Sequence, residues 1–129
     1  MWFFIMKTFY TKKNIQQEIR LWAIETFSSI PNQENIIILL SEVIQNIYRH
    51  AYEKLDNQKI EVAWTADQKH IEFIIHDDAI SQNLDFLKEE FEPTEDGKMG
   101  LRIIKKIAKQ FSIQHKPQGH ETRVTVNIN

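Results

Sequence analysis

The chain is 129 residues long, which suits one domain, so we expect residues 1–129 to fold as a single unit. Its 16 Lys+Arg and 18 Asp+Glu give a net charge of −2, which argues against a general nucleic-acid-binding protein. The absence of cysteine excludes disulfides, thiolate nucleophiles and Cys-ligated metal sites. No long apolar run and no signal peptide are visible, so we expect a cytoplasmic protein without a membrane span.

Strand and helix patterns alternate in the first half of the chain. Residues 2–10 are rich in aromatic and β-branched side chains and predict a strand. Apolar residues at helical spacing predict a helix over 14–27 and, after a break, a second helix from 32 or 33 to about 55. Alternating side chains over 59–65 and 71–76, with a turn at 66–68 between them, predict a β-hairpin.

The second half begins with a polar, irregular segment over 77–94, within which a short helix is expected around 84–91. A helix is predicted over 101–110, followed by strands over 111–115 and 122–128 joined by a turn at 117–119. Because hairpins dominate, the predicted fold class is α+β. We expect a two-layer sandwich with one mixed, mostly antiparallel sheet and the helices on one face.

Three polar residues form one stripe on the second predicted helix: Glu42, Asn46 and His50. Residues four apart drift by only about 40° around a helix axis, and this stripe borders the apolar one, so we expect it to be half buried. An amide oxygen suits Mg²⁺, and a carboxylate can act as a general base toward a hydroxyl or water. The spacing equally suits a boundary stripe that forms local hydrogen bonds, with the two ionisable groups in solvent.

The segment Gly97-Lys98-Met99-Gly100-Leu101 directly precedes the next predicted helix and holds two of the chain's three glycines. Glycines let backbone N–H groups approach a phosphate, and a helix N-terminus favours negative charge, to which Lys98 would add. An ordinary turn at the start of a helix would have the same composition.

Asp77 ends the apolar strand, where its carboxylate could accept a hydrogen bond from an adenine amino group in an apolar pocket. Asp is also common as a turn residue at the end of a strand, which is the alternative interpretation. The five histidines of the chain show no metal-ligand spacing.

The order of these features resembles that of the GHKL ATPases. Residues 40–52, with the pattern E-x-x-x-N-x-x-x-H-A-Y, are similar to the asparagine box of the stand-alone anti-sigma factor serine kinases. Residues 71–77 resemble the strand leading to the adenine-binding Asp, 97–104 the glycine-rich box, and 119–124 the late G-x-x-T element.

The resemblance implies the Bergerat ATP-binding fold, with ATP and Mg²⁺ as cofactors and a nucleotide lid at about residues 82–97. By matched position, Glu42 would be the general base and Asn46 the Mg²⁺ ligand, while Asp77 and Thr122 would read adenine. The other implied nucleotide contacts are His50, Ala79, Gly97, Lys98, Met99, Gly100 and Leu101.

In this family the phosphoryl acceptor is typically a Ser on a STAS-domain anti-anti-sigma partner. A sigma factor and a second copy of the chain are further candidate partners. The resemblance thus implies an ATP-dependent protein serine kinase that regulates a partner protein.

Two other functions stay open. The family pattern D-x-G-x-G reads Asp77-Asp78-Ala79-Ile80-Ser81 here, so both glycines are replaced and Ile80-Ser81 would fill space beneath the base. A module that sequesters a partner without turning over ATP is therefore one alternative. The catalytic domain of a histidine kinase is the other, although no helix with a phosphoacceptor His is present.

Overall fold

The computed structural model describes residues 5–80 and 98–128 of the chain. Within them, five antiparallel strands form one sheet in the order β1-β2-β3-β5-β4. The strands are β1 (Ile5–Tyr10), β2 (Lys59–Ala66), β3 (His70–Asp77), β4 (Gln110–His115) and β5 (His120–Asn127). This arrangement places β3 at the centre of the sheet, between β2 and β5.

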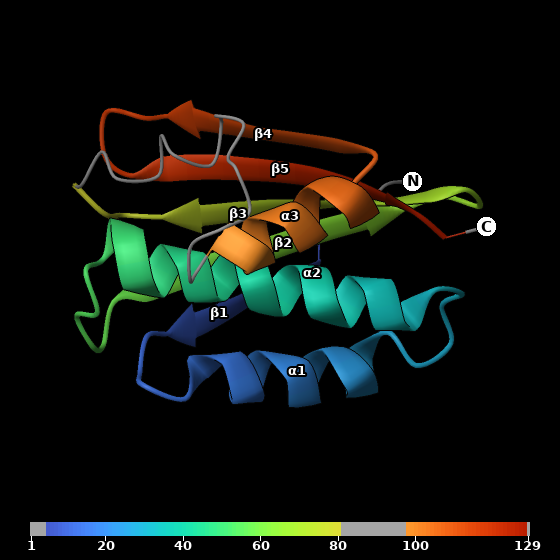
Figure 1. Ribbon diagram of the computed structural model, residues 1–129, viewed down its shortest axis with the longest axis horizontal. Helices are drawn as coiled ribbons and strands as arrows, with labels where there is room; N and C mark the ends of the chain where they lie inside the picture. The colour runs from blue at the N-terminus through green and yellow to red at the C-terminus, as the bar shows by residue number, and fades with distance from the viewer. Residues whose placement is uncertain (1–4, 81–97, 129) are drawn as a thin grey trace.

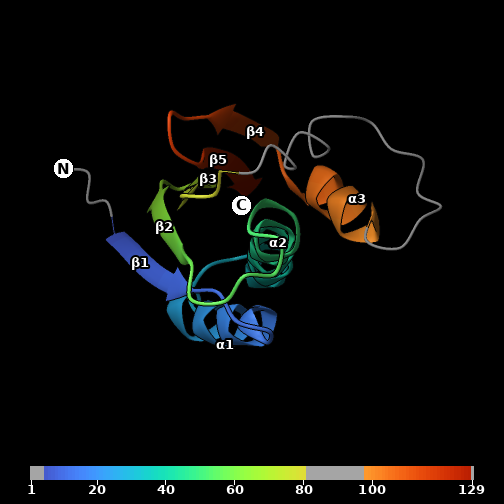
Figure 2. The same cartoon turned by 90° about the vertical axis from the view of Figure 1, so that its left-hand side faces the viewer.

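The helices lie on one face of this sheet, as the end-on view in Figure 2 shows. They are α1 (Ile15–Thr26), α2 (Gln33–Asn46) with a π-helical continuation η1 (Ile47–Ala51), and α3 (Lys98–Ile107). α2 contacts both α1 and α3 and runs along the middle of the sheet (Figure 1). The predicted α+β fold with helices on one face is confirmed. Across the described residues, no helix is long and apolar enough to cross a bilayer.

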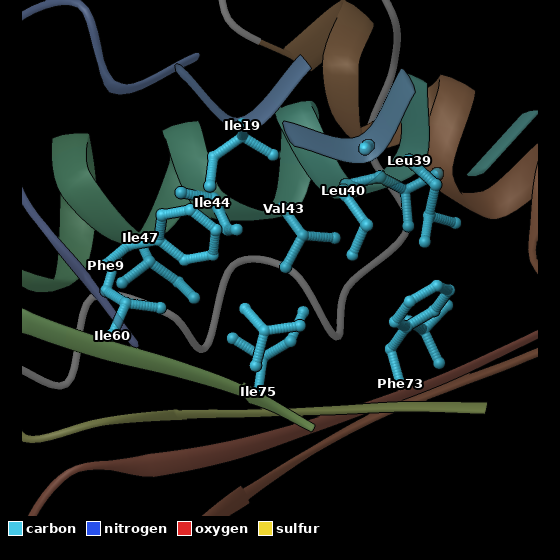
Figure 3. Packing of buried hydrophobic residues seen from close by; sticks show 14 of the residues in the cluster. Phe9, Ile19, Leu39, Leu40, Val43, Ile44, Ile47, Ile60, Phe73 and Ile75 are labelled. Carbon is cyan, nitrogen blue, oxygen red and sulfur yellow. The ribbon is translucent and has the colours of Figure 1, made fainter. Parts of the chain in front are cut away.

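The core lies between α2 and the two central strands. Alternation on β2 turns Ile60 and Val62 toward the helices, and the same alternation on β3 buries every second residue. The apolar stripe of α2 meets these residues across the layer, as Figure 3 shows. Its labelled members are Leu39, Leu40, Val43, Ile44 and Ile47 above Ile60, Phe73 and Ile75.

An aromatic cluster closes the core beside α1. Trp22 packs edge-to-face on Phe9, Phe27 and Trp64, with ring centroids 5.1–5.5 Å apart. Phe27 in turn contacts Phe73 edge-to-face at 5.5 Å. Such pairs stabilise beyond their buried area, so the cluster holds α1 against β1, β2 and β3.

The second helix is shorter than the sequence predicts. α2 ends at Asn46, the π-helical turn η1 follows, and the helical run stops near Tyr52 instead of Leu55. Glu53 and Lys54 adopt left-handed backbone angles, with φ of 52° and 65°, which a helix cannot contain. The predicted end at Leu55 is therefore wrong.

The third helix starts earlier than predicted. α3 begins at Lys98 instead of Leu101, so that Gly100 lies inside its first turn and not in a turn before it. It ends at Ile107 instead of Gln110, because the next residues join the sheet and Lys109 donates its N–H to the Thr125 carbonyl at 2.7 Å.

The strand predictions are confirmed with small shifts of their ends. The turn at 117–119 is confirmed by a 3.0 Å hydrogen bond from the Lys116 N–H to the Gly119 carbonyl. Three predicted features lie wholly or partly outside the described residues. They are the beginning of the strand predicted over 2–10, the short helix at 84–91 and the lid at 82–97.

Candidate functional site

Asp77 is the last residue of β3, and its side chain is fully buried. It continues the helix-facing row of Ile71, Phe73 and Ile75, so the strand's own alternation aims a carboxylate into the apolar layer. A buried carboxylate is costly unless it is paired, so its hydrogen bonds define the chemistry of this end of the sheet.

One oxygen of the Asp77 carboxylate carries both of its hydrogen bonds. Oδ1 accepts the Ala79 N–H at 3.0 Å and lies 3.0 Å from Nδ1 of His120. Oδ2 is buried and has no hydrogen-bond partner among the described residues. Burial raises the pKa of Asp77, while the hydrogen bonds of His120 and Ala79 act in the opposite sense.

Thr122 supplies a second buried polar atom close to this carboxylate. The register places Asp77 opposite His120 and Ile75 opposite Thr122, so Asp77 and Thr122 are diagonal neighbours on one face. Diagonal neighbours in an antiparallel pair lie about 7–8 Å apart at their α-carbons. The Thr122 Oγ1 is buried and also without a partner among the described residues. Together these atoms can receive a small ligand that carries both a donor and an acceptor.

The three polar residues predicted on the second helix do border the apolar layer. Glu42 is half buried, and its Oε1 accepts a 3.4 Å hydrogen bond from Nε2 of Gln16 on α1. Asn46 is only 4% exposed, and its Nδ2 has no partner among the described residues. His50 lies on η1, where burial is the main cause that lowers its pKa. The structure therefore keeps Glu42 and Asn46 at α-helical spacing, whereas His50 lies on a wider turn.

Tyr52 connects the end of this helical run to the Asp77 end of the sheet. Its hydroxyl donates to the Lys59 carbonyl at 2.6 Å and accepts the Asp78 N–H at 2.7 Å. Burial is the main cause that raises the pKa of Tyr52 to about 12, so the phenol stays protonated near neutral pH. The Tyr52 side chain thus fixes the end of the helical run formed by α2 and η1 against both β2 and the residue after Asp77.

The segment after Asp77 differs from its prediction. Ala79 is buried, as expected for a residue near the base site, but Ile80 is 91% exposed. Ile80 therefore does not fill the space beneath a bound base, because the 77–79 turn directs its side chain outward. Ser81 lies outside the described residues.

The glycine-rich segment lies at the start of α3. Lys98, Met99, Gly100 and Leu101 form its first turn, although their side chains lie outside the described part, as does the whole of Gly97. Because α3 contacts α2, this turn belongs to the same helical layer as Glu42 and Asn46. The first N–H groups of a helix have no partner within it and favour an anion.

Two residues of this site received no role from the sequence, His120 and Tyr52, although both lie within the motifs over 119–124 and 40–52. His120 is 1% exposed, and the sequence placed it within the G-x-x-T element and among histidines without metal-ligand spacing, with no role of its own. Alternation along the last strand, where His120 shares a face with Thr122, could have indicated its burial. Its contact with Asp77 depends on the strand register, which the local sequence does not specify.

Comparisons with known proteins bear on the family and the fold of the chain. Residues 12–126 match the family described as the histidine kinase-like ATPase domain. A comparison with curated proteins found no match. The catalytic domain of the histidine kinase ThkA is similar in structure, with a TM-score of 0.58 and 14% identity over 96% of each chain.

Two further structures share the fold. The Acinetobacter baumannii histidine kinase AdeS has a TM-score of 0.53 and 14% identity, covering 95% of this chain and 68% of that one. The histidine kinase domain of a blue-light activated kinase from Erythrobacter litoralis EL346 has a TM-score of 0.55 and 16% identity. That comparison covers 74% of this chain, which spans 44% of the Erythrobacter chain. At such identities the likeness concerns the fold, and the match over residues 12–126 shows that the chain belongs to the histidine kinase-like (GHKL) ATPase domain family.

Proposed function

We propose that this chain binds ATP with Mg²⁺ at the Asp77 end of its sheet. The observation that carries the proposal is the pair of buried atoms Asp77 Oδ2 and Thr122 Oγ1, which have no partner among the described residues. A buried polar atom without a partner costs about 1–3 kcal/mol, which a ligand with complementary groups recovers. Adenine offers an amino donor for the carboxylate and ring nitrogens for the hydroxyl.

The other end of the nucleotide would reach the helical layer. Asn46 would offer its amide oxygen to Mg²⁺, for which oxygen ligands are preferred. The first turn of α3, from Lys98 to Leu101, would offer backbone N–H groups to the phosphates. Bound Mg²⁺ would neutralise negative charge on the triphosphate.

We further propose that the chain is a protein serine kinase whose partner is a STAS-domain anti-anti-sigma protein. Glu42 would accept the proton of the partner's Ser hydroxyl as its oxygen bonds to the γ-phosphorus and ADP leaves. Glu42 suits this role because it is half buried and one helical turn before Asn46. The similarity of residues 40–52 to the asparagine box of the anti-sigma factor kinases supports this choice of partner.

The second candidate function is a module that sequesters its partner without phosphorylating it. The observation that favours it is the buried methyl group of Ala79, 4% exposed, where the family pattern has glycine. A side chain at this point takes space next to the Asp77 carboxylate and would weaken nucleotide binding.

Thermal unfolding and calorimetry with ATP, ADP and GTP, each with and without Mg²⁺, test the binding step. ATP at 100 times its Kd stabilises the fold by about 2.7 kcal/mol, which raises the Tm by several degrees. GTP is the matched control, because its carbonyl replaces the amino group that Asp77 would bind. No Tm shift with millimolar ATP and Mg²⁺ contradicts the ATP proposal.

Transfer of labelled γ-phosphate to a STAS-domain protein tests the kinase step. Labelled partner protein supports the kinase. ATP binding and tight partner binding without transfer would instead favour the sequestering module.

A further inference from the structure

A buried imidazole lies against the carboxylate that is proposed to read the base. His120 is the first residue of β5, its side chain is 1% exposed, and the register places it directly opposite Asp77. Its Nδ1 lies 3.0 Å from Asp77 Oδ1, and its Nε2 is buried without a partner among the described residues. A buried pair of this kind needs an explanation beyond packing, because an apolar side chain would fill the same space without desolvating a histidine.

The hydrogen bonds show what the imidazole can do for Asp77. Oδ1 accepts from the Ala79 N–H on one side and faces His120 Nδ1 on the other. Because these donors come from two different parts of the chain, they fix both the position and the plane of the carboxylate. Oδ2 is then left in one defined direction and without a competing protein donor among the described residues.

We propose that His120 is a positioning residue that makes Asp77 a directed hydrogen-bond acceptor for the amino group of a purine. Its Nδ1–H donates to Oδ1, so the neutral ring carries its proton on Nδ1 and a lone pair on Nε2. This inference rests on the proposed binding of a nucleotide at Asp77 and adds the residue that sets its preference for an amino-bearing base.

The charges around the pair explain why a donor is needed there. Burial raises the pKa of Asp77 and the neighbouring Asp78 raises it further, and both favour a protonated carboxyl that would donate instead of accept. From the residue after η1, the Tyr52 hydroxyl is bonded to the Asp78 N–H, and from β4 the His115 ring packs edge-to-face on His120 at 4.9 Å. The donor on His120, together with the Ala79 N–H, therefore favours the ionised, accepting form of Asp77.

On the opposite face of the sheet, the charged side chains around Glu121 are separate from the pair of His120 and Asp77. Glu121, which follows His120, turns to the opposite face, where it forms ion pairs with Lys116 and Arg123 and lies 3.4 Å from Nε2 of His76. Those charges pair with one another, and the contact between His120 and Asp77 lies on the helix-facing side.

Substitutions at residue 120 separate positioning from packing. His120→Asn keeps an N–H donor on the same branch as imidazole Nδ1, whereas His120→Gln carries its amide one bond further out and loses that donor. His120→Leu removes both nitrogens. His70→Leu, at the opposite end of β3, is a matched control for losing a histidine from the sheet.

The measurement is the Kd of ATP and of inosine triphosphate, each with Mg²⁺, for parent and variants. Inosine triphosphate has the same sugar and phosphates but carries a carbonyl in place of the amino group. We expect His120→Leu and His120→Gln to weaken ATP binding about 10- to 100-fold, as for loss of one charge-assisted hydrogen bond, with little change for inosine triphosphate. His120→Asn should recover most of the ATP affinity, and His70→Leu should bind ATP as the parent does.

Nitrogen-15 NMR of the histidine rings supplies a readout that does not need a ligand. At neutral pH we expect the His120 ring to carry its proton on Nδ1 and to have an unprotonated Nε2. A ring protonated only on Nε2 overturns it.

The outcomes separate this inference from the proposed function. If the parent does not bind ATP, the proposed function fails and the inference fails with it. If the parent binds but His120→Asn and His120→Gln discriminate ATP from inosine triphosphate equally, the positioning role alone is overturned. Should His120→Leu not fold, the comparison of the Asn and Gln variants decides.

Discussion

The backbone of Gly119 lies so close to Asp77 that a Cβ on Gly119 would come within 1.8 Å of the Asp77 carbonyl oxygen. Gly119 also has a φ of +84°, a region that other residues rarely adopt. The turn between β4 and β5 thus lies directly against the end of β3, next to the pair that His120 and Asp77 form in the β3–β5 register.

Gly119→Ala should destabilise the fold severely, because the added carbon meets backbone atoms that cannot rotate away. Strain from the positive φ alone costs about 1–3 kcal/mol, and the clash adds to it. Urea unfolding of the variant should show a loss above about 2 kcal/mol. Gln118→Ala, at an exposed position in the same turn, is the control and should stay within about 0.5 kcal/mol of the parent.

Asp77→Asn should leave the fold intact and weaken ATP binding at least about tenfold. The amide oxygen must remain at the Oδ1 position, because the Ala79 N–H and His120 Nδ1 both need an acceptor there. The amide NH₂ then takes the place of Oδ2 and opposes the amino group of the base. Calorimetry measures the change, and equal affinity in parent and variant would show that Asp77 is only a turn residue. Asp78→Asn, at the exposed neighbour, is the control.

The parent and the Asp77→Asn variant also differ in how their stability depends on pH. The pKa of Asp77 is raised in the folded state, so between its unfolded value, about 3.9, and that raised value the native protein binds more protons. The contribution of Asp77 to the stability of the parent should therefore fall as pH rises through this window. Asp77→Asn lacks this contribution, so its stability relative to the parent should improve as pH rises from about 4 to the raised pKa of Asp77. A difference that is constant with pH in urea unfolding would contradict the prediction.

Glu42→Gln should keep ATP binding and lose phosphoryl transfer. Loss of a general base costs typically about 10²- to 10⁴-fold in rate, and Gln preserves the size of the side chain next to Gln16. Transfer of labelled phosphate to the partner is the measurement. Equal transfer in parent and variant would exclude Glu42 as the base.

Asn46→Ala should weaken the binding of ATP itself, because it removes the proposed Mg²⁺ ligand. We expect the ATP affinity to fall in the presence of Mg²⁺ and to change little when the metal is chelated. A similar loss under both conditions would indicate that Asn46, which is 4% exposed, acts only through packing.

Tyr52→Phe should destabilise the Asp77 end of the sheet by about 1–3 kcal/mol. The change leaves the Lys59 carbonyl and the Asp78 N–H without the hydroxyl that both now contact. Tyr48→Phe is the matched control on the same helical run, because its hydroxyl donates to the exposed Asp56 carboxylate at 2.9 Å. Urea unfolding should show a clearly smaller loss for Tyr48→Phe, and equal losses would contradict the connecting role of Tyr52.

The fold could be predicted from the sequence because each element carries its own periodicity. Alternation at Ile60, Val62 and Trp64 indicated a strand with one buried side, and the structure buries or half buries all three. The end of the second helix could not be predicted in the same way. Glu53 and Lys54 are residues that favour helix, yet both adopt left-handed conformations, and the Lys54 N–H closes the turn on the Tyr48 carbonyl at 2.8 Å.

The sequence could predict the residues of the candidate site that lie on one helix, but not the contact between residues on different strands. Glu42 and Asn46 lie within one helix, so their spacing alone places them on one stripe. Asp77 and His120 are 43 residues apart and meet only through the pairing of β3 with β5. Neither strand's pattern specifies that register, so the contact emerges only from the three-dimensional structure.

The aromatic cluster beside α1 gives the chain a built-in optical reporter. In the β2–β3 register, Trp64 lies opposite Phe73 and Ile60 lies opposite Asp77. The two pairs are four residues apart along the strands, so the cluster lies about 13 Å from Asp77. Near-ultraviolet circular dichroism from rings held at fixed angles, such as Trp22 against Trp64, is lost when specific packing is lost. This signal therefore separates two kinds of substitution at Asp77 or His120. One abolishes nucleotide binding and leaves the near-ultraviolet signal unchanged, whereas the other reduces the signal because it loosens the fold.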